Sequence, residues 1–565
     1  MLSDFDLEGM SKPEKLVYYI KNYGMSYATK KMMKKLGFAP DPDSEYMAWC
    51  RRNSEPKSVK KAQIEELNEK GALKKYCVLL SDADNSTHAK RSTALASVND
   101  ASYGYVKVVE AVDEKQALEN IDGEYVVLME DDAVLLDDFF IELEKALKEM
   151  PDADIIYSDE DSVNKNRRFR PYFKPDRSPM LLLNFQYMGS VWVIKRTLLN
   201  DILKDESVRL LWNHWYALAL EAFKRTDKIC HVKRCLFSNL RTDSGFVRST
   251  SESQLMCLKE YVSRHNIAAE VTSSDVPGFY HLKYKLEKKP LVSIIIPNMD
   301  HIDDLKKCID SIFEVSTYEN VEIIIAENNS KEQETFDYYN EIVLANKKVK
   351  VVYWKEEFNY SAINDYACEV ARGDLFLFLN NDTQIINPEA IEELVAGAMQ
   401  PGFGASGALL FYGDDTIQHA GVIIGMGGFA AHALWSLTDR DEKYYPFSVT
   451  SREMGGVTGA CLMMRREAFE KVGGFDRDFR VALNDIDLCM KVRGAGYEIL
   501  FTPYARLYHY ESKSRGYEDT MEKQARFQTE IDRFQTKWKK ELEAGDEYYN
   551  VNLTLHRADY SMDIE

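Results

Sequence analysis

Short apolar stretches alternate with helical stretches through the second half of this sequence, and that alternation limits the fold more than any other feature. The apolar stretches are "LVSIIIP" (291–297), "VEIIIAENNS" (321–330), "VKVVYW" (349–354) and "DLFLFLNND" (374–382). The stretches between them, where the spacing of apolar residues predicts helices, are 302–313, 333–346 and 361–371. A chain that alternates strand and helix in this way predicts an α/β domain with a mostly parallel, helix-covered sheet.

The first half of the sequence follows the same plan. Strands are expected at "YCVLLSDAD" (76–84), "YVKVVEA" (105–111) and "GEYVVLMEDDAVL" (123–135). The stretches "DGEYVVLMEDDAVLLDDFFIELEKAL" and "RGDLFLFLNNDTQIINPEAIEELVAGA" each contain a glycine, an acidic residue, a buried strand, an acidic or amide cluster and a helix. They lie about 250 residues apart, which is too long for a solenoid repeat. We therefore expect two α/β domains of related fold.

The chain divides into an N-terminal helical segment, a first α/β domain, a second α/β domain, and a C-terminal helix with a tail. The predicted bounds are 1–72, 73–288, 289–515 and 516–565. The C-terminal helix places apolar residues on one face, at Phe527, Ile531, Phe534, Trp538 and Leu542. Such a face packs on a domain or lies on a membrane surface. The mixed charges of "KKELE" (539–543) weaken the membrane interpretation.

Composition excludes several classes of protein. The 565 residues include 45% hydrophobic and 12% aromatic residues, which is typical of a globular chain. A net charge of −20 argues against nucleic acid as a partner and against broad attachment to anionic membranes. The nine cysteines form no CxxC pair, which favours a reducing compartment without disulfides or a zinc site. We expect a cytoplasmic protein.

Polar residues follow three strands of the second half at the point where each strand ends. They are Pro297 with Asn298, the run "ENNS" (327–330), and Asn380, Asn381 and Asp382. Ligands of parallel α/β sheets bind at the carboxyl ends of the strands, and a hard divalent cation prefers oxygen ligands. The bland interpretation of "NND" is a turn, because Asn and Asp favour turns and helix caps.

Further along, Asp485 and Asp487 stand at the start of a predicted helix. Carboxylates at that position are helix caps or, in an active site, a general base. His509 follows in a polar run with Glu511 and Arg515. A lone histidine is often structural, but these neighbours are suited to a metal ion or a diphosphate.

Six segments, taken in order and with their spacing, resemble the inverting family 2 glycosyltransferases of the GT-A fold. The segments are "LVSIIIPNMD", "IIIAENNS", "GDLFLFLNND", "TGACLMMRREAFEKVGGFDRDF", "NDIDLCMKVRGAGY" and "YHYES". The branch that the sequence resembles most contains bacterial two-domain enzymes that build rhamnose-containing and other cell-surface polysaccharides, and "TIQHAGV" (416–422) belongs to its pattern. The resemblance covers roughly 75–555 and is strongest over 290–555. It implies tandem GT-A domains with Rossmann-like, mostly parallel sheets.

The resemblance also implies roles for the residues at the strand ends. Asp382 stands at the metal-binding motif, and Asn381 lies nearer the ribose of the nucleotide. Asn328 stands against the base, and Pro297 and Asn298 line the same edge. His509, at the position of a late histidine, completes the metal shell around Mg²⁺ or Mn²⁺, and Arg515 is expected to contact the nucleotide sugar.

On the acceptor side, Asp485 is implied as the catalytic base, while Asn484 replaces the acid of the usual Glu-Asp pair. Thr458, Gly459, Asn484 and Asp487 are expected to shape the pocket for the sugar and the acceptor. The metal motif has one carboxylate where many relatives have two or three, so metal affinity is expected to be modest.

The implied reaction is a single displacement with inversion. The donor is dTDP-rhamnose or a UDP-sugar, and the acceptor is a glycan or a lipid-linked glycan. The resemblance implies work in bacterial cell-surface polysaccharide synthesis, with at most peripheral contact at the inner face of the plasma membrane. A homodimer is possible.

The first half keeps the metal-motif position in Asp131 and Asp132 but lacks other parts of the site. Its base position holds Trp215 or His214, and an indole cannot take a proton. The late histidine is replaced by Ser238 or Asn239. We therefore expect an inactive scaffold, acceptor-binding or oligomerisation domain, and the alternative is a second active transferase with a displaced base.

Two other classes of protein stay open. A glycan-binding scaffold would have both halves degenerate. A nucleotidyltransferase usually carries a glycine-rich, basic phosphate loop after its first strand, and "IIIPNMDHIDD" (294–304) has neither glycine nor lysine. The released product would separate these classes, since a transferase releases a nucleoside diphosphate and a nucleotidyltransferase releases pyrophosphate.

Overall fold

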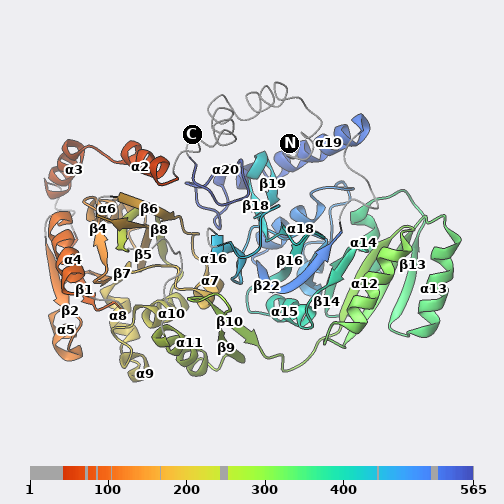
Figure 1. The fold of residues 1–565 in the computed structure, drawn as a ribbon, viewed down its shortest axis with the longest axis horizontal. Helices are drawn as coiled ribbons and strands as arrows, with labels where there is room; N and C mark the ends of the chain where they lie inside the picture. Colours follow the sequence, from red (N-terminus) through yellow and green to blue (C-terminus); the bar gives the residue numbers. More distant parts are fainter. Residues whose placement is uncertain are drawn as a thin grey trace.

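Two α/β halves lie side by side in the computed structural model, each built around one sheet (Figure 1). The structure describes residues 42–69, 74–83, 87–102, 105–165, 167–241, 252–441, 444–510 and 520–563. Two helices precede the first sheet, α2 (Pro42–Asn53) and α3 (Lys57–Glu69). The predicted N-terminal helical segment is thus described only from Pro42 onward. None of the helices in these ranges is long and apolar enough to span a membrane.

The first half has the strand order β2-β1-β3-β7-β5-β8-β4, with β6 beside β5. Its strands are β1 (Tyr76–Ser81), β2 (Val106–Glu110), β3 (Tyr125–Glu130), β4 (Ala133–Leu135), β5 (Ile155–Asn164), β6 (Arg167–Tyr172), β7 (Val191–Lys195) and β8 (Ile229–Leu240), followed by the hairpin β9 (Ala269–Ser273) and β10 (Tyr280–Tyr284). Its helices are α4 (His88–Ala101), α5 (Glu114–Asn120), α6 (Phe139–Glu149), α7 (Pro179–Asn184), α8 (Arg196–Ile202), α9 (Glu206–Arg209), α10 (Trp215–Arg225) and α11 (Glu252–Arg264).

The second half has the order β13-β12-β11-β14-β21-β16-β22-β15. Its strands are β11 (Val292–Asn298), β12 (Val321–Asn328), β13 (Val349–Trp354), β14 (Leu375–Leu379), β15 (Thr383–Ile385), β16 (Phe403–Phe411), β17 (Ile417–His419), β18 (Val422–Ile424), β19 (Ala430–His432), β20 (Arg452–Glu453), β21 (Cys461–Arg465) and β22 (Glu498–His509). Its helices are α12 (Ile302–Glu314), α13 (Gln333–Ala345), α14 (Tyr360–Val370), α15 (Ala390–Ala398), the 3₁₀ turn η1 (Met426–Gly428), α16 (Tyr445–Ser448), α17 (Arg466–Lys471), α18 (Asn484–Gly494), α19 (Met521–Lys537) and α20 (Lys539–Ala544).

The two sheets follow the same order, which confirms the predicted pair of related α/β domains. β11, β14, β21, β16, β22 and β15 of the second half correspond to β1, β3, β7, β5, β8 and β4 of the first. The described part of the first half has no counterpart of β13 and α14, so its early portion is one strand and one helix shorter. In the second half the parallel order is confined to β13-β12-β11-β14 and the β16-β22 pair, and β21 and β15 run antiparallel to their neighbours.

Successive residues of the apolar strands face opposite cores, because strand side chains alternate. Ile294 and Ile296 pack with α12, α13 and α15, whereas Ile295 packs with α14, α17 and α18. Both faces of the sheet are therefore covered by helices, which explains why the strands read as unbroken apolar runs. A close approach of the neighbouring strand explains the glycine before each central strand. A Cβ at Gly373 would lie 2.6 Å from Ser293 N, and one at Gly123 would lie 2.9 Å from Lys75 O.

The C-terminal helix packs on the second domain. Phe534 and Ile531 of α19 are buried against Phe479, Ile486 and neighbouring apolar residues, and Phe527, Trp538 and Leu542 pack on the same cluster. These are the residues of the predicted apolar face. The packing interpretation is confirmed, and this face is not available to a membrane.

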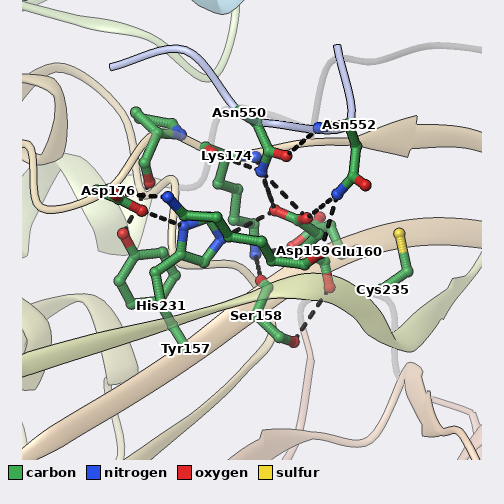
Figure 2. A network of polar contacts seen from close by, with 12 residues as sticks. Tyr157, Ser158, Asp159, Glu160, Lys174, Asp176, His231, Cys235, Asn550 and Asn552 are labelled. Carbon is green, nitrogen blue, oxygen red and sulfur yellow. Dashed lines mark hydrogen bonds and ion pairs between the residues drawn. The ribbon is translucent and has the colours of Figure 1, made fainter. Parts of the chain in front are cut away.

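The segment after α20 crosses to the first domain, where Asn550 reaches a buried polar network (Figure 2). The side-chain nitrogen of Asn550 donates to both carboxylate oxygens of Asp159, at 3.0 and 3.1 Å. His231 lies between Asp159, at 3.0 Å, and Asp176, at 2.8 Å. Burial alone would lower the pKa of His231, but the two carboxylates raise it. The C-terminal segment is therefore held to the first domain by a neutral amide that donates to a buried carboxylate.

Candidate active site

Strand pairing brings Asp382 next to His509. Residues 380–382 connect β14 to β15, and Thr383 of β15 is paired with His509 of β22. The backbone N–H of Tyr510 also donates to the Asp382 carbonyl at 2.9 Å. The predicted metal position and the late histidine, 127 residues apart in sequence, thus meet at the end of β14, and both side chains are buried.

The side chains of Asp382 and His509 point at one another. Asp382 Oδ1 lies 3.2 Å from His509 Nε2. The other ring nitrogen, Nδ1, lies 2.7 Å from Gln418 Oε1, and Asn380 Nδ2 lies 3.1 Å from Nε2. A carboxylate oxygen and an imidazole nitrogen facing one point form a donor set that suits Mn²⁺ and similar cations. The residues present therefore fit a divalent cation.

A chain of hydrogen bonds joins the polar residues at the ends of β11, β12 and β14. Asn381 donates to Asn298 Oδ1 at 2.6 Å, and Asn298 donates to the Tyr339 hydroxyl at 2.7 Å. That hydroxyl donates to Glu327 at 2.7 Å. Asn328 is buried beside them, with its amide 3.4 Å from the Glu356 carbonyl. The residues expected to contact the nucleotide, among them the half-buried Pro297 of β11, are thus gathered at one edge of the sheet.

Asp485 lies in the first turn of α18. Its Oδ2 accepts a hydrogen bond from Gly459 N at 2.7 Å, and its Oδ1 accepts one from Ile486 N at 2.9 Å. The residue before the helix, Leu483, has a left-handed backbone with φ of 60°, a strained conformation found at functional sites. Asp485 itself is only half-buried. It is therefore held firmly from the protein side and keeps access to solvent.

Two consecutive residues connect Asp485 to the metal-motif segment. Gly459 donates its N–H to Asp485, and the carbonyl of Ala460 accepts a hydrogen bond from Asn380 N at 3.1 Å. The two predicted halves of the site, 380–382 with His509 and the start of α18, are thus joined through the backbone of 459–460. Thr458, next in line, is buried, and its N–H lies 3.4 Å from His419 Nε2.

The other two polar residues at the start of α18 are buried. Asn484 is 4% exposed, and its side-chain nitrogen has no hydrogen-bond partner among the described residues. Asp487 is completely buried, accepts a hydrogen bond from Trp538 Nε1 at 2.8 Å and pairs with Lys537 at 2.7 Å. Burial raises its pKa despite these partners. The structure gives Asp487 a contact with the C-terminal helix, while its expected place in the acceptor pocket stays a prediction.

Sequence reasoning missed Gln418, and the prediction for Arg515 is not tested by the described residues. Arg515 lies outside the described residues. Gln418 contacts His509 but received no role, although "TIQHAGV" was among the segments that carried the resemblance. The signal was an amide two residues into a quoted motif, and only the fold connects it to a histidine 91 residues away.

In the first half, an arginine occupies the corresponding end of the sheet. Asp131 is buried, and its Oδ1 accepts a hydrogen bond from Ala83 N at 2.9 Å. Arg91 lies 3.4 Å from Asp131, 2.5 Å from Asp82 and 3.0 Å from Glu110. These carboxylates follow or end β1, β2 and β3, so the guanidinium stands where a nucleotide would meet a parallel sheet. Asp132 is the counterpart of Asp382, one residue before β4.

In the first half, other side chains of the same domain occupy the positions that correspond to Asp485 and His509. Trp215 begins α10, where α18 of the second half carries Asp485, and it is buried. Asn239 is paired with Ala133, as His509 is with Thr383, and donates to Glu160 at 3.0 Å.

Gly189 of the first half stands where the second half has Gly459. A Cβ there would overlap the Glu160 carboxylate. Glu160 in turn pairs with the fully buried Lys174 at 2.9 Å. The Glu160 carboxylate is therefore paired within the first domain, beside Gly189.

Comparison with known proteins finds relatives of this chain. The model of the family described as "Glycosyl transferase family 2" matches residues 293–473, the part that holds β11 to β21. An uncharacterized protein, y4gI of Sinorhizobium fredii, is 36% identical over 79% of this chain and 50% of its own length. The O-antigen biosynthesis protein RfbC of Myxococcus xanthus is 33% identical over 77% of this chain and 34% of its own length.

A third relative has a named reaction. An N-acetylglucosaminyl-diphospho-decaprenol L-rhamnosyltransferase of Mycobacterium tuberculosis is 30% identical over 25% of this chain and 49% of its own length. The chain thus spans about half or less of the length of these curated relatives. The family match and the named relatives confirm the resemblance seen in the sequence. Through its second domain, the chain is a member of glycosyl transferase family 2.

Proposed function

We propose that the second domain transfers a sugar from a nucleoside-diphosphate sugar to a glycan or lipid-linked glycan, with inversion, in bacterial cell-surface polysaccharide synthesis. The observation that carries this proposal is the link through Gly459 and Ala460, which joins Asp485 to the segment that ends in Asp382. The names of two relatives, an O-antigen biosynthesis protein and an L-rhamnosyltransferase, support this pathway and a rhamnose donor such as dTDP-rhamnose. A lipid-linked acceptor would bring the enzyme to the inner face of the plasma membrane.

Asp485 is the general base of the proposed reaction. Each of its oxygens accepts one backbone N–H, which leaves lone pairs for the acceptor hydroxyl. The N-terminus of α18 favours its negative charge. The carboxylate takes the proton of the hydroxyl that attacks the anomeric carbon, and base catalysis of this kind contributes about 10²–10⁴-fold.

Asp382 and His509 would hold a divalent cation, Mg²⁺ or Mn²⁺. When bound, the cation stabilises the negative charge that develops on the leaving diphosphate. The described residues contain no group of three or more Asp, Glu, His or Cys that could hold a metal ion. Oxygens of the diphosphate and water would therefore complete the coordination, as is common for Mg²⁺ and its substitutes. Asn381 and Asn298 remain at the edge of the sheet to orient the nucleotide.

The first domain has no catalytic role in this proposal. Arg91 supplies a fixed positive charge at the end of its sheet, and Lys174 pairs with the carboxylate that lies against Gly189. In this proposal the Arg91 guanidinium excludes a nucleotide sugar from the end of the sheet, and the Lys174–Glu160 pair excludes a base beside Gly189. The first domain instead serves as a scaffold for the second, held to it by the C-terminal segment.

The test measures release of nucleoside diphosphate from dTDP-, UDP- and GDP-sugars, with Mg²⁺, Mn²⁺ or EDTA. We expect one donor to turn over, with loss in EDTA, in Asp485→Asn and in Asp382→Asn, and full activity in Asp132→Asn. Loss in Asp132→Asn would assign a role to the first domain, and pyrophosphate instead of nucleoside diphosphate would identify a nucleotidyltransferase. Binding of a nucleotide sugar without turnover in the presence of glycan acceptors would favour a scaffold.

A further inference from the structure

His509 is held between two side-chain amides, one at each ring nitrogen. Gln418 Oε1 lies 2.7 Å from Nδ1, and Asn380 Nδ2 lies 3.1 Å from Nε2. The two amides come from different parts of the domain, β17 and the segment after β14. The ring is therefore fixed from both sides, and its orientation does not depend on a single contact.

These two contacts select one tautomer of the ring. An amide oxygen can only accept, so Nδ1 must carry the proton that it shares with Gln418. An amide nitrogen can only donate, so Nε2 must offer a lone pair to Asn380. The two contacts agree for the neutral ring, in which Nε2 is an acceptor. Asp382 Oδ1 lies 3.2 Å from Nε2 as well. A proton on Nε2 pairs the ring with this carboxylate, and a divalent cation would take the place of that proton, while Nδ1 donates to Gln418 in either state.

Gln418 is itself held in place. It is 1% exposed on β17, and its backbone carbonyl accepts a hydrogen bond from His432 Nδ1 at 3.0 Å. The next residue, His419, is completely buried, and burial lowers its pKa well below the ordinary value. His419 is thus neutral, so it adds no positive charge beside the place where a cation would bind.

We propose that Gln418 is a positioning residue that keeps the proton of His509 on Nδ1 and thereby presents Nε2, together with Asp382 Oδ1, to the divalent cation. This inference rests on the proposed metal-dependent function and adds a residue that acts on the metal through another side chain. Metal-binding histidines commonly donate their second N–H to such an acceptor. Replacing that acceptor weakens metal affinity by about 10–100-fold.

The experiment measures Mn²⁺ binding to the full chain by the electron paramagnetic resonance signal of free Mn²⁺, with the nucleoside diphosphate present. We expect Gln418→Met to bind Mn²⁺ about 10–100-fold more weakly than wild type. Gln418→Glu should retain the affinity, because a carboxylate also accepts the Nδ1 proton. Gln186→Met replaces another buried glutamine, in the first domain, and should change nothing.

A second measurement reports the tautomer directly in the metal-free protein. The ¹⁵N side-chain resonances of His509, assigned by comparison with His509→Gln, should show protonated Nδ1 in wild type and a loss of that state in Gln418→Met. Wild-type affinity in Gln418→Met, or an Nδ1 without a proton in wild type, would overturn the inference, and the second result needs no variant of Gln418 to fold. Absence of Mn²⁺ binding in wild type together with protonated Nδ1 would instead overturn the metal part of the proposed function.

Discussion

Asp485 receives a hydrogen bond of 2.7 Å from the backbone N–H of Gly459, and the absence of a side chain at Gly459 makes this contact possible. A Cβ at position 459 would lie 3.0 Å from the Tyr360 hydroxyl and 3.2 Å from Asp485 Cβ. Either neighbour would have to move by a few tenths of an ångström. The position of the proposed base thus depends on a glycine 26 residues earlier in the chain.

Gly459→Ala should therefore lower kcat about 10–100-fold, because small displacements of a catalytic group are costly. The melting temperature should change little. The control is Gly494→Ala, at the other end of α18, where a Cβ meets open space. Steady-state kinetics and thermal unfolding check both variants, and unchanged kcat in Gly459→Ala would show that Asp485 does not need this contact.

The two aspartates of α18 should separate catalysis from stability. Asp485→Asn removes the base and should lower kcat about 10²–10⁴-fold while leaving nucleotide affinity unchanged. Asp487→Asn weakens the contacts with Lys537 and Trp538 and should lower the free energy of unfolding by about 1–3 kcal/mol, with kcat retained. Calorimetry, kinetics and urea unfolding measure these quantities. A large loss of kcat in folded Asp487→Asn would instead support the predicted place of Asp487 in the acceptor pocket.

Arg91→Leu should destabilise the first domain without affecting transfer by the second. The substitution removes the guanidinium that balances the fully buried carboxylate of Asp131 and two further carboxylates. Breaking a buried ion pair from one side costs about 3–5 kcal/mol. The matched control is Arg209→Leu, which breaks an exposed pair with Glu114 and should cost less than about 1 kcal/mol. Equal effects of the two substitutions on urea unfolding would contradict the expected role of Arg91.

Glu453 should make the contact between the two domains sensitive to pH. It is buried and accepts hydrogen bonds from the Ser178 hydroxyl and from Met180 N, across the domain boundary. Burial raises the pKa of Glu453 to about 7. A raised carboxyl pKa stabilises the fold fully below the ordinary value of 4.5, and this contribution is lost as the pH rises through about 7. The expected loss is about 3 kcal/mol.

Glu453→Gln tests this pH dependence, because an amide cannot ionise. Its oxygen can accept from Met180 N while its nitrogen donates to the Ser178 hydroxyl. The difference in unfolding free energy between about pH 5 and about pH 8 should shrink in the variant relative to wild type. Unfolding by urea at the two pH values measures it. An unchanged difference would mean that Glu453 titrates at its ordinary pKa, or that other groups cause the pH dependence.

Local patterns predicted the elements of the fold well, because each depended on neighbours in the sequence. The expected helices 302–313 and 333–346 lie within two residues of α12 and α13, and the run "LFLFL" became the fully buried β14. The positions of the polar residues after three strands predicted that they would lie at one edge of the sheet, since parallel strands end together. These conclusions needed only periodicity and the chemistry of strand ends.

Contacts between distant residues could not be predicted in this way. Asp485 and Asp487 have the same appearance in sequence, yet one is half-buried beside Gly459 and the other is fixed to a helix that begins at Met521. Arg91 received no prediction from the sequence, and only the fold brings it, on α4, to the ends of three strands. Such contacts depend on how elements pack, and packing is not encoded by local propensity.

The fixed charge of Arg91 has a consequence for how ligand supply affects the stability of each half in a cell. A ligand that binds only the folded second domain raises its free energy of unfolding with concentration, by about 2.7 kcal/mol at one hundred times Kd. In the first domain the positive charge comes from Arg91 itself, which pairs with Asp131. The free energy of unfolding of the first domain therefore does not rise with ligand concentration. If the second domain has the proposed activity, we expect starvation for sugar nucleotide to expose it to proteolysis before the first domain.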